Sequence, residues 1–371
     1  MKKIGRNDLC WCDSGLKYKK CHLNRSEEEL VKMHEADKIL QDEYKKGYCS
    51  APEALKKECS GNIVKAHSVA KASSLQAVSD KGHVYGLKGA LQNISKRKGS
   101  LLLEKIGINQ ASTFTGFCSK HDNDLFELIE KGIFSETKEE CFLHAYRALC
   151  KEYFTKKNAK GLEGFRRKLD AGKPIEEQIA YQSRNNPYEI GLNAGMNDLL
   201  KRKSIFDNIL LTKKFDRFNS FIIKFNTVPT VMATGGKNII YDFDGKSLQN
   251  LEDLNKLPSA VFYNYFSSQK KGYVIFSWIS SPDGVVDQFI ASLMNIGKKE
   301  MTNALIRFIF SSCENLYTSP VWWEGLKGDK QKALMGRIKS ATNLYEDYNA
   351  EYLKDDNVNY GDWDYDESVR L

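Results

Sequence analysis

The spacing of apolar side chains changes along the chain from a helical period to a period of two. Between the capping box Ser26–Glu29 and Gly47, apolar residues recur every three or four positions, which predicts a connector helix over 26–48. Residues 137–154 place apolar side chains on two flanks of a helix, and a helical, basic pattern continues over 155–215. Helices should therefore occupy much of these three segments.

From Phe218 onward, β-branched and aromatic residues dominate short segments that are bounded by Pro and Gly. The predicted strands cover residues 218–225, 228–234 and 238–241, and the clearest hairpin joins 259–266 to 272–280. Residues 287–300 and 302–317 are apolar and helical in pattern, so they should cover one face of an antiparallel sheet. We predict an α+β fold whose body contains this sheet and its helices.

Charge is unevenly distributed along the chain. The formal net charge is +8, but residues 345–371 contain nine acidic and two basic side chains, a charge of −7, so the other 344 residues carry +15. A body this basic suits an anionic partner such as nucleic acid or a ribosomal surface. Clusters of Lys and Arg occur at 96–98, 156–157, 166–168 and 201–203. The acidic tail either folds back on this basic body or forms a solubilising, disordered end.

The apolar segments are short. The longest nearly continuous apolar run, Tyr273–Ile279, which only Ser277 interrupts, falls far below the roughly 20 residues that a membrane-spanning helix needs. The basic N-terminus lacks the apolar stretch that would follow it in a signal peptide, so we expect a cytoplasmic protein without a membrane partner. No glycine-rich loop with phosphate-binding spacing follows a predicted strand, which argues against an NTPase or a dinucleotide-dependent enzyme.

Cysteine and histidine residues gather near the start of the chain. Six of the nine cysteines and five of the six histidines lie within the first 121 residues. Because a reducing cytosol disfavours disulfides, metal binding is the better explanation of this clustering. Cys141, His144 and Cys150 lie on the broad apolar face of residues 137–154, and we expect them to be packed in a core rather than to bind metal.

Residues 1–25, here called the knuckle, carry the most complete set of metal ligands. Cys10, Cys12, Cys21 and His22 supply three thiolates and one imidazole, which is a full tetrahedral set for zinc. The intervening Asp13–Gly15 is a turn sequence that brings the second ligand pair back over the first. Metal binding would fold a segment that is too short to have a core of its own. With zinc bound, the knuckle would carry a charge of about +4 and form a basic, exposed adaptor.

The stretch Gly5–Asp8, together with the closing stretch Lys17–His22, resembles the SEC-C motif, a small zinc knuckle named from the C-terminus of the bacterial protein-export motor ATPase. Members of this family usually have Pro where Leu9 and Trp11 stand and Gly where Asp13 stands, and none of these three positions is a ligand. The resemblance implies zinc binding and docking to a protein or ribosomal partner in a bacterial-type cytoplasm. Because the motif is fused to many unrelated proteins, it assigns no activity to the rest of the chain.

A second set of potential ligands follows the predicted connector helix. Two residues separate Cys118 from His121, a spacing that places both side chains on one side of a helix start and is common in half of a zinc site. Two thiols further upstream supply the other half, and we assign the set as a structural zinc site; the alternative is that these cysteines are simply buried. The assigned residues are Cys49, Cys59, Cys118 and His121.

Between the two halves of this set, a short β-like run ends in His67. The order of these features resembles that in HNH (ββα-metal) nucleases with a structural zinc. The features are a thiol pair, a histidine at a strand end, a long loop and a pair of ligands at the start of a helix. By this resemblance His67 would be the general base and would work with a magnesium or manganese ion. Asp122, Asn123 and His83 are the candidates for holding that ion.

This chain departs from the HNH pattern at Ala66, where many members have a second histidine or an aspartate. The departure leaves two roles open for the histidines of this segment. Either His67 is catalytic, or His67 or His83 is a zinc ligand in place of one of the cysteines.

These features predict five parts and two functional hypotheses. The parts are the knuckle (1–25), a connector helix (26–48), a ββα-like zinc module with helices (49–155), an α+β body with a helical linker region (156–344) and the acidic tail (345–371). In the first hypothesis the knuckle docks to a macromolecular partner while the basic body engages nucleic acid or ribonucleoprotein. In the second, the protein is an HNH-like nuclease that acts in defence against foreign DNA. A scaffold that contacts only protein is a third possibility.

Overall fold

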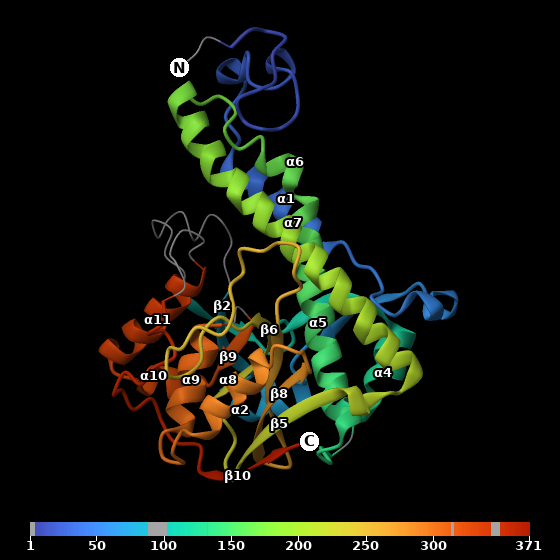
Figure 1. Cartoon of the computed structure of the whole chain (residues 1–371), viewed down its shortest axis with the longest axis vertical. Helices are drawn as coiled ribbons and strands as arrows, with labels where there is room; N and C mark the ends of the chain where they lie inside the picture. Colours follow the sequence, from blue (N-terminus) through green and yellow to red (C-terminus); the bar gives the residue numbers. More distant parts are fainter. Residues whose placement is uncertain (1–3, 88–101, 132, 313–314, 343–348) are drawn as a thin grey trace. The chain divides into compact units, whose positions relative to one another are not determined.

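The computed structural model describes residues 4–87, 102–131, 133–312, 315–342 and 349–371 (Figure 1). These residues form two compact units. The first unit contains the described residues within 1–46 and 155–197, and the second contains those within 47–89, 100–154 and 198–371. Helices α5 (Lys138–Gly161) and α7 (Ile175–Thr212) each contribute residues to both units.

The first unit is helical outside the knuckle. Besides the parts of α5 and α7, it contains the 3₁₀ turn η1 (Tyr18–Lys20) within the knuckle, the 3₁₀ turn η2 (Arg25–Glu27), and the helices α1 (Met33–Lys45) and α6 (Glu163–Arg166). Helical structure over the end of α5, α6 and α7 agrees with the pattern predicted for 155–215. A turn at Gly172, ahead of Pro174, separates α6 from α7, since proline favours the start of a helix over its interior.

Helix α1 begins at Met33, well after the predicted start at Ser26. Tertiary contacts hold the intervening segment outside the helix: the backbone N–H of Gly172 donates to the carbonyl of Arg25 (2.9 Å), and Arg25 also pairs with Asp170 (3.1 Å). Gly172 has a φ of +73°, and a Cβ atom there would lie 2.6 Å from the carbonyl oxygen of Glu28. Residues 26–29 therefore do not start a helix, because this segment packs against the loop before α7.

The second unit contains a two-stranded sheet and an eight-stranded sheet, both antiparallel. The two-stranded sheet pairs β1 (Ile63–His67) with β4 (Thr113–Cys118). The eight-stranded sheet has the order β10-β5-β8-β7-β6-β9-β2-β3. Its strands are β2 (His83–Leu87), β3 (Leu103–Gly107), β5 (Phe218–Phe225), β6 (Val231–Asn238), β7 (Ala260–Ser268), β8 (Lys271–Ile279), β9 (Leu316–Thr318) and β10 (Tyr365–Arg370).

Helices cover both faces of the eight-stranded sheet (Figure 1). Alternate residues of β5 point to opposite faces of the sheet. Phe221 and Ile223 pack with α8 (Val285–Met294) and α9 (Met301–Phe310), whereas Ile222 packs on the side of α5. The fold is therefore α+β, as predicted. The other helical elements of this unit are η3 (Glu53–Glu58), η4 (Lys71–Leu75), α2 (Gln76–Val78), α4 (Ser119–Lys131), η5 (Phe215–Arg217), α10 (Pro320–Gly325) and α11 (Gly328–Thr342).

Two details of the sheet differ from the sequence pattern. The hairpin of β7 and β8 is confirmed, but its turn consists of Gln269 and Lys270, whose φ angles of 51° and 62° are those of a type I′ turn without the usual Asn or Gly. Strand β6 continues through Gly235 and Gly236, where the sequence predicted a break. A Cβ at Gly235 would lie 2.6 Å from the hydroxyl oxygen of Tyr263, so the glycines make room for cross-strand aromatic rings.

The acidic tail, described from residue 349 onward, is folded. Leu353, Tyr360 and Trp363 are buried in the main core, and β10 adds a strand beside β5. Of the two states considered for this tail, the structure shows the one that folds back on the basic body. The ion pairs that join it to the body include Asp355–Arg307 (3.0 Å), Asp356–Arg337 (2.7 Å) and Glu367–Lys224 (2.8 Å).

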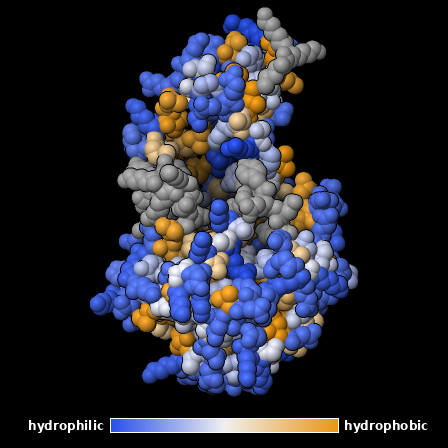
Figure 2. All heavy atoms as spheres, turned by 90° about the vertical axis from the view of Figure 1, so that its left-hand side faces the viewer, coloured by the Kyte–Doolittle hydropathy of each residue, from blue (hydrophilic) through white to orange (hydrophobic). Residues whose placement is uncertain are grey.

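Polar groups dominate the surface that is visible in Figure 2, where apolar side chains are interspersed among hydrophilic ones. Scattered exposed apolar residues of this kind are normal for a folded protein. Among the helices in the described part of the chain, none combines the length and the apolar character required to cross a membrane.

Candidate metal centres

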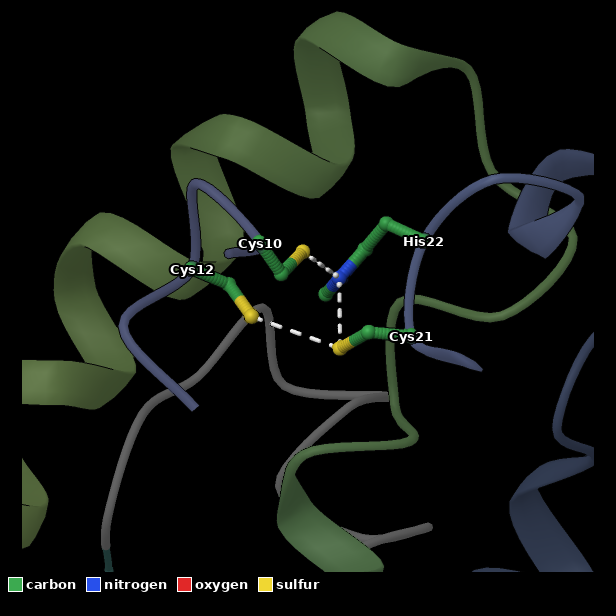
Figure 3. A group of neighbouring side chains, drawn as sticks. All are labelled: Cys10, Cys12, Cys21 and His22. Atoms are coloured by element: carbon green, nitrogen blue, oxygen red, sulfur yellow. Dashed lines mark hydrogen bonds between the residues drawn. The ribbon is translucent and has the colours of Figure 1, made fainter. Parts of the chain in front are cut away.

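The knuckle brings Cys10, Cys12, Cys21 and His22 together; we call these residues the first Cys/His group. Their ligand atoms all lie within 4.8 Å of one another. Figure 3 shows the four side chains pointing toward a common centre, with the Nδ1 atom of His22 lying 3.2 Å from the Sγ atom of Cys10 and 3.1 Å from that of Cys21. The Sγ atoms of Cys12 and Cys21 are 3.5 Å apart.

Backbone geometry explains how so short a segment places four ligands. Asp13 and Gly15 have φ angles of 55° and 71°, which is the left-handed conformation of the predicted turn. The turn is closed by a hydrogen bond from the N–H of Cys10 to the carbonyl of Leu16 (2.8 Å). Turn η1 then presents Cys21 and His22 to the first pair of thiols.

Buried hydrogen bonds set the ionisation of this group. Burial alone raises the pKa of Cys12, but hydrogen bonds from His22 and Ser14 lower it to about 6. Burial alone lowers the pKa of His22, whereas its hydrogen bonds with Asp170 and Cys12 raise it to about 10. The first Cys/His group therefore contains a thiolate at neutral pH, which is the form in which cysteine binds metal.

Asp170, which no sequence pattern indicates, contacts this group from outside the knuckle. Its Oδ2 atom lies 3.0 Å from the Nε2 atom of His22, on the side of the ring away from the thiols. In the sequence, 148 positions separate these two residues, so no spacing pattern links them. The contact becomes visible only when the loop between α6 and α7 is placed beside the knuckle.

Cys49, Cys59, Cys118 and His121 form a second Cys/His group, whose ligand atoms also lie within 4.8 Å of one another. The Nδ1 atom of His121 lies 3.4 Å from the Sγ atom of Cys49, 3.4 Å from that of Cys59 and 3.3 Å from that of Cys118. The structure therefore brings together the four residues that were assigned from the sequence.

Strand pairing positions this group. Cys118 ends β4 opposite Ile63 of β1, and His121 follows in the first turn of α4. The segment that carries Cys49 is attached to β4 through a hydrogen bond from the N–H of Ser50 to the carbonyl of Gly116 (2.8 Å). Burial raises the pKa of Cys118, but backbone donors, with that of His121 the strongest, lower it to about 6. This group too holds a thiolate at neutral pH.

The Nε2 atom of His121 is buried and has no hydrogen-bond partner among the described residues. It differs in this respect from the Nε2 atom of His22, which contacts Asp170. Both imidazoles direct Nδ1 toward three sulfur atoms, so the two groups share their ligand set and differ in what lies behind the ring.

His67 ends β1, as the sequence predicted, and belongs to neither Cys/His group. It is half-buried, with Nε2 3.3 Å from the carbonyl oxygen of Ile108, and burial lowers its pKa. His83 lies exposed on β2, with Nδ1 2.9 Å from the carbonyl oxygen of Lys81. The four-residue groups thus assemble without either of these histidines.

Among the candidates for a catalytic cation site, Asp122 and His83 belong to no metal-binding group found in the described residues, although Asp122 interacts electrostatically with His67. Asp122, in the first turn of α4, pairs with Arg147 (3.1 Å), which also pairs with Glu130 (2.7 Å). Asn123 is exposed. Across the ranges that the structure describes, no third cluster of His, Cys, Asp or Glu side chains has the geometry of a metal site.

Cys141, His144 and Cys150 are buried in α5, which agrees with the core role expected for them. The ring of His144 stacks on Phe266 with a centroid separation of 4.5 Å. Burial lowers the pKa of His144 to about 3, so this imidazole is neutral in the folded protein at neutral pH.

The chemistry of the donors decides which metals fit. Three thiols and one imidazole in a closed four-ligand set are typical of structural zinc sites, whereas magnesium and calcium sites are built from oxygen ligands. Both Cys/His groups have the soft set and could hold a metal ion.

Comparison with known proteins assigns only the first of these two groups. No curated protein and no solved structure matches the chain. The family model of the SEC-C motif matches residues 6–24, a segment that includes every residue of the first Cys/His group. The chain therefore carries a SEC-C motif with a Cys/His cluster suited to zinc.

Proposed function

We propose that both Cys/His groups bind zinc, that the knuckle docks the protein to a macromolecular partner, and that the basic residues of the protein, in the body and in the knuckle, engage nucleic acid or ribonucleoprotein. The observation that carries this proposal is the basic surface of the knuckle. Arg6, Lys17, Lys19 and Lys20 are all exposed and form no ion pair with other described residues. A small surface with a net positive charge attracts phosphate groups through the release of counterions.

Several basic clusters of the body contribute less to such a surface. Arg166 donates to the carbonyl of Ala159 (2.6 Å), and Arg167 forms an ion pair with Glu189. Arg202 is buried and donates to a backbone carbonyl, while Lys203 pairs with Asp207 (2.7 Å). The cluster at 96–98 lies outside the described residues. Arg166, Arg167, Arg202 and Lys203 are therefore less available to a polyanion than the exposed lysines of the knuckle, whereas Lys168 and Lys201 are exposed as well.

The binding proposal is tested by the salt dependence of binding to labelled DNA and RNA, measured by fluorescence anisotropy. A triple variant with Lys17→Gln, Lys19→Gln and Lys20→Gln should weaken binding and reduce the slope of log K against log salt by about one per lost phosphate contact. The matched control carries Lys213→Gln, Lys214→Gln and Lys299→Gln, three exposed lysines of the second unit.

The control should bind as the wild type does. Equal binding by the two triple variants would remove the knuckle from the interface. Undetectable binding of the wild type to every polynucleotide at moderate salt would favour a scaffold that contacts only protein.

A second candidate function is an HNH-like nuclease, and the arrangement of β1, β4 and α4 around the second Cys/His group favours it. His67 ends the first of these strands, and its lowered pKa keeps the imidazole neutral, as a general base requires. Asp122 opens the helix, but its carboxylate is paired with Arg147. A catalytic cation would therefore need this ion pair to open or would need ligands from the substrate.

Plasmid nicking tests this candidate. Purified protein with magnesium or manganese should nick DNA, and His67→Ala should abolish nicking while the zinc content stays unchanged. His34→Ala, at an exposed histidine of α1, is the matched control and should remain active. If no divalent metal elicits cleavage of DNA or RNA by the wild type, the nuclease candidate fails.

A further inference from the structure

Asp170 lies in the loop between α6 and α7 and is completely buried, with 0 % of its surface exposed. A buried carboxylate is unfavourable unless charges and hydrogen-bond donors surround it. It also lies outside residues 6–24, which match the SEC-C motif. Its contacts therefore call for an explanation that the motif does not supply.

The ring of His22 connects Asp170 to the thiols. Its Nδ1 atom faces the Sγ atoms of Cys10 and Cys21 at 3.2 and 3.1 Å, and its Nε2 atom faces the Oδ2 atom of Asp170 at 3.0 Å. Once a metal ion replaces the proton on Nδ1, the remaining proton on Nε2 would be donated to the carboxylate and the lone pair of Nδ1 would be directed at the centre of the group. Histidines that bind metal commonly have such a partner on the second ring nitrogen, which fixes the tautomer and the ring orientation.

Two further side chains hold the carboxylate in place. The Nε atom of Arg25 lies 3.1 Å from Oδ1, and Gln182 on α7 donates to Oδ2 at 2.6 Å. Arg25 forms an ion pair with the carboxylate, and its Nη2 atom donates to the carbonyl of Arg167 at 2.7 Å. Gln182 donates to the same carbonyl at 3.1 Å. The loop that carries Asp170 is thus fixed from the knuckle on one side and from α7 on the other.

A separate contact links α7 to the loop of the knuckle that carries Cys12. The side-chain amide of Asn186 donates to the carbonyl of Cys12 at 3.1 Å. Both ligand pairs of the first Cys/His group are therefore supported by residues of α7 or of the loop before it. The second group provides an internal comparison, because the Nε2 atom of His121 has no such partner in the described structure.

We infer that Asp170 is a positioning residue for metal binding by the first Cys/His group. It holds the imidazole of His22 in the tautomer and orientation that present Nδ1 to the metal, and it couples metal binding in the knuckle to the order of the α6–α7 segment. This inference rests on the proposed binding of zinc. It extends the metal centre beyond the SEC-C motif to a residue far away in the sequence.

Competition of zinc-loaded protein with a chromophoric chelator tests the inference on the full chain. Asp170→Asn preserves the shape of the side chain but removes its charge, and it should weaken binding of one of the two zinc equivalents about 10- to 100-fold. The other equivalent should keep its wild-type affinity. Asp207→Asn is the matched control on α7, since Asp207 accepts from Tyr146 and Lys203 and contacts neither group. It should leave both affinities unchanged.

A spectroscopic readout separates positioning from general destabilisation. With cobalt(II) in place of zinc, Asp170→Asn should retain the sulfur-to-metal charge-transfer bands and shift the ligand-field bands of one site, because the ligands stay while the imidazole turns. Wild-type affinity and an unshifted cobalt(II) spectrum in this variant would overturn the inference alone. A wild-type protein that holds no zinc at the first group would overturn the zinc proposal together with it.

Gln182→Met keeps the inference testable if Asp170→Asn does not accumulate as folded protein. This substitution removes the 2.6 Å hydrogen bond to the carboxylate oxygen that also accepts from His22, while the carboxylate itself stays. The expected result is a loss of roughly threefold to tenfold in affinity at the same zinc equivalent, in line with one hydrogen bond. Unchanged affinity in Gln182→Met would contradict the inference.

Discussion

The two units of this protein are stabilised in different ways. Each of the four clusters of buried apolar side chains found in the described residues is built from residues of the second unit. The first unit instead buries a network of charged and amide side chains around Asp170, together with the first Cys/His group. A unit with little apolar surface to bury needs a metal or other cross-link to be stable, whereas a unit with a large core does not.

The same contrast distinguishes the two Cys/His groups. Cys49 and Cys118 of the second group are themselves part of a hydrophobic cluster that includes Phe117 and Phe126. The first group is surrounded by charged, hydrogen-bonded side chains such as Asp170 instead of by a hydrophobic cluster. A metal ion would therefore reinforce structure that already exists in the second unit, whereas in the first it would supply much of the free energy of folding.

Removal of the metal should have the largest effect on this comparison. Structural zinc in a knuckle contributes on the order of 10–16 kcal/mol at neutral pH, so a strong chelator should unfold the knuckle. Hydrogen exchange followed by mass spectrometry should then show full loss of protection for residues 8–23 and for the loop around Asp170. Strands β5, β7 and β8 should stay protected. Equal loss of protection in both units would contradict the distinction between them.

A cavity in the second unit should have the next largest effect. The ring of Phe126 packs edge-on against Phe117 with centroids 5.0 Å apart, and the guanidinium of Arg147 lies 4.1 Å from its centre. Phe126→Ala should lower the free energy of unfolding by about 3–5 kcal/mol, as measured by urea denaturation. Zinc affinity at the first Cys/His group should not change. A variant that loses zinc from the first group would show that the two units are not independent.

A smaller effect is expected from pH. Because the pKa of His144 is lowered from 6.5 to about 3, the unfolded chain binds a proton between these values that the folded protein does not. Stability should therefore fall as the pH drops below 6.5, by about 2 kcal/mol at pH 5. His144→Phe removes this titration, and its unfolding free energy should vary correspondingly less between pH 7 and pH 5. An equal pH dependence in variant and wild type would place the acid sensitivity elsewhere.

The smallest effect should come from Ser14, whose hydroxyl lies 3.3 Å from the Sγ atom of Cys21 and accepts from the N–H of Leu16. Ser14→Ala should weaken zinc binding at the first group by about 1 kcal/mol, or roughly fivefold, in the chelator competition. Ser60→Ala, near the second group, should leave the first affinity unchanged. If Ser14→Ala lowered zinc affinity as much as Asp170→Asn does, the environment of the thiols would matter for zinc binding as much as the orientation of the imidazole.

The sequence predicted those features that depend on local spacing. The ligands of the knuckle, the pairing of Cys118 with His121 and the hairpin of β7 and β8 all follow from patterns that span a few residues. The α+β class followed from the change of apolar period near Phe218. These features are predictable because one turn or one strand determines each of them.

Features that depend on distant contacts were not predictable. Nothing in the sequence near His22 indicates its contact with Asp170. Helix α1 begins later than predicted because the backbone of Arg25 is hydrogen-bonded to Gly172 in the loop before α7. Likewise, Gly235 and Gly236 in β6 suggested a turn, whereas aromatic rings of the neighbouring strand require the space. Local propensity was outweighed in each case by packing against a segment far away in the sequence.

Native mass spectrometry of protein that has never met a chelator tests the central claim most directly, because it counts the metal ions on each folded chain. The account predicts two zinc ions per wild-type chain, one of which is lost in Cys12→Ser and the other in Cys118→Ser. A wild-type chain that carries no zinc, or one ion that survives both substitutions, would contradict it.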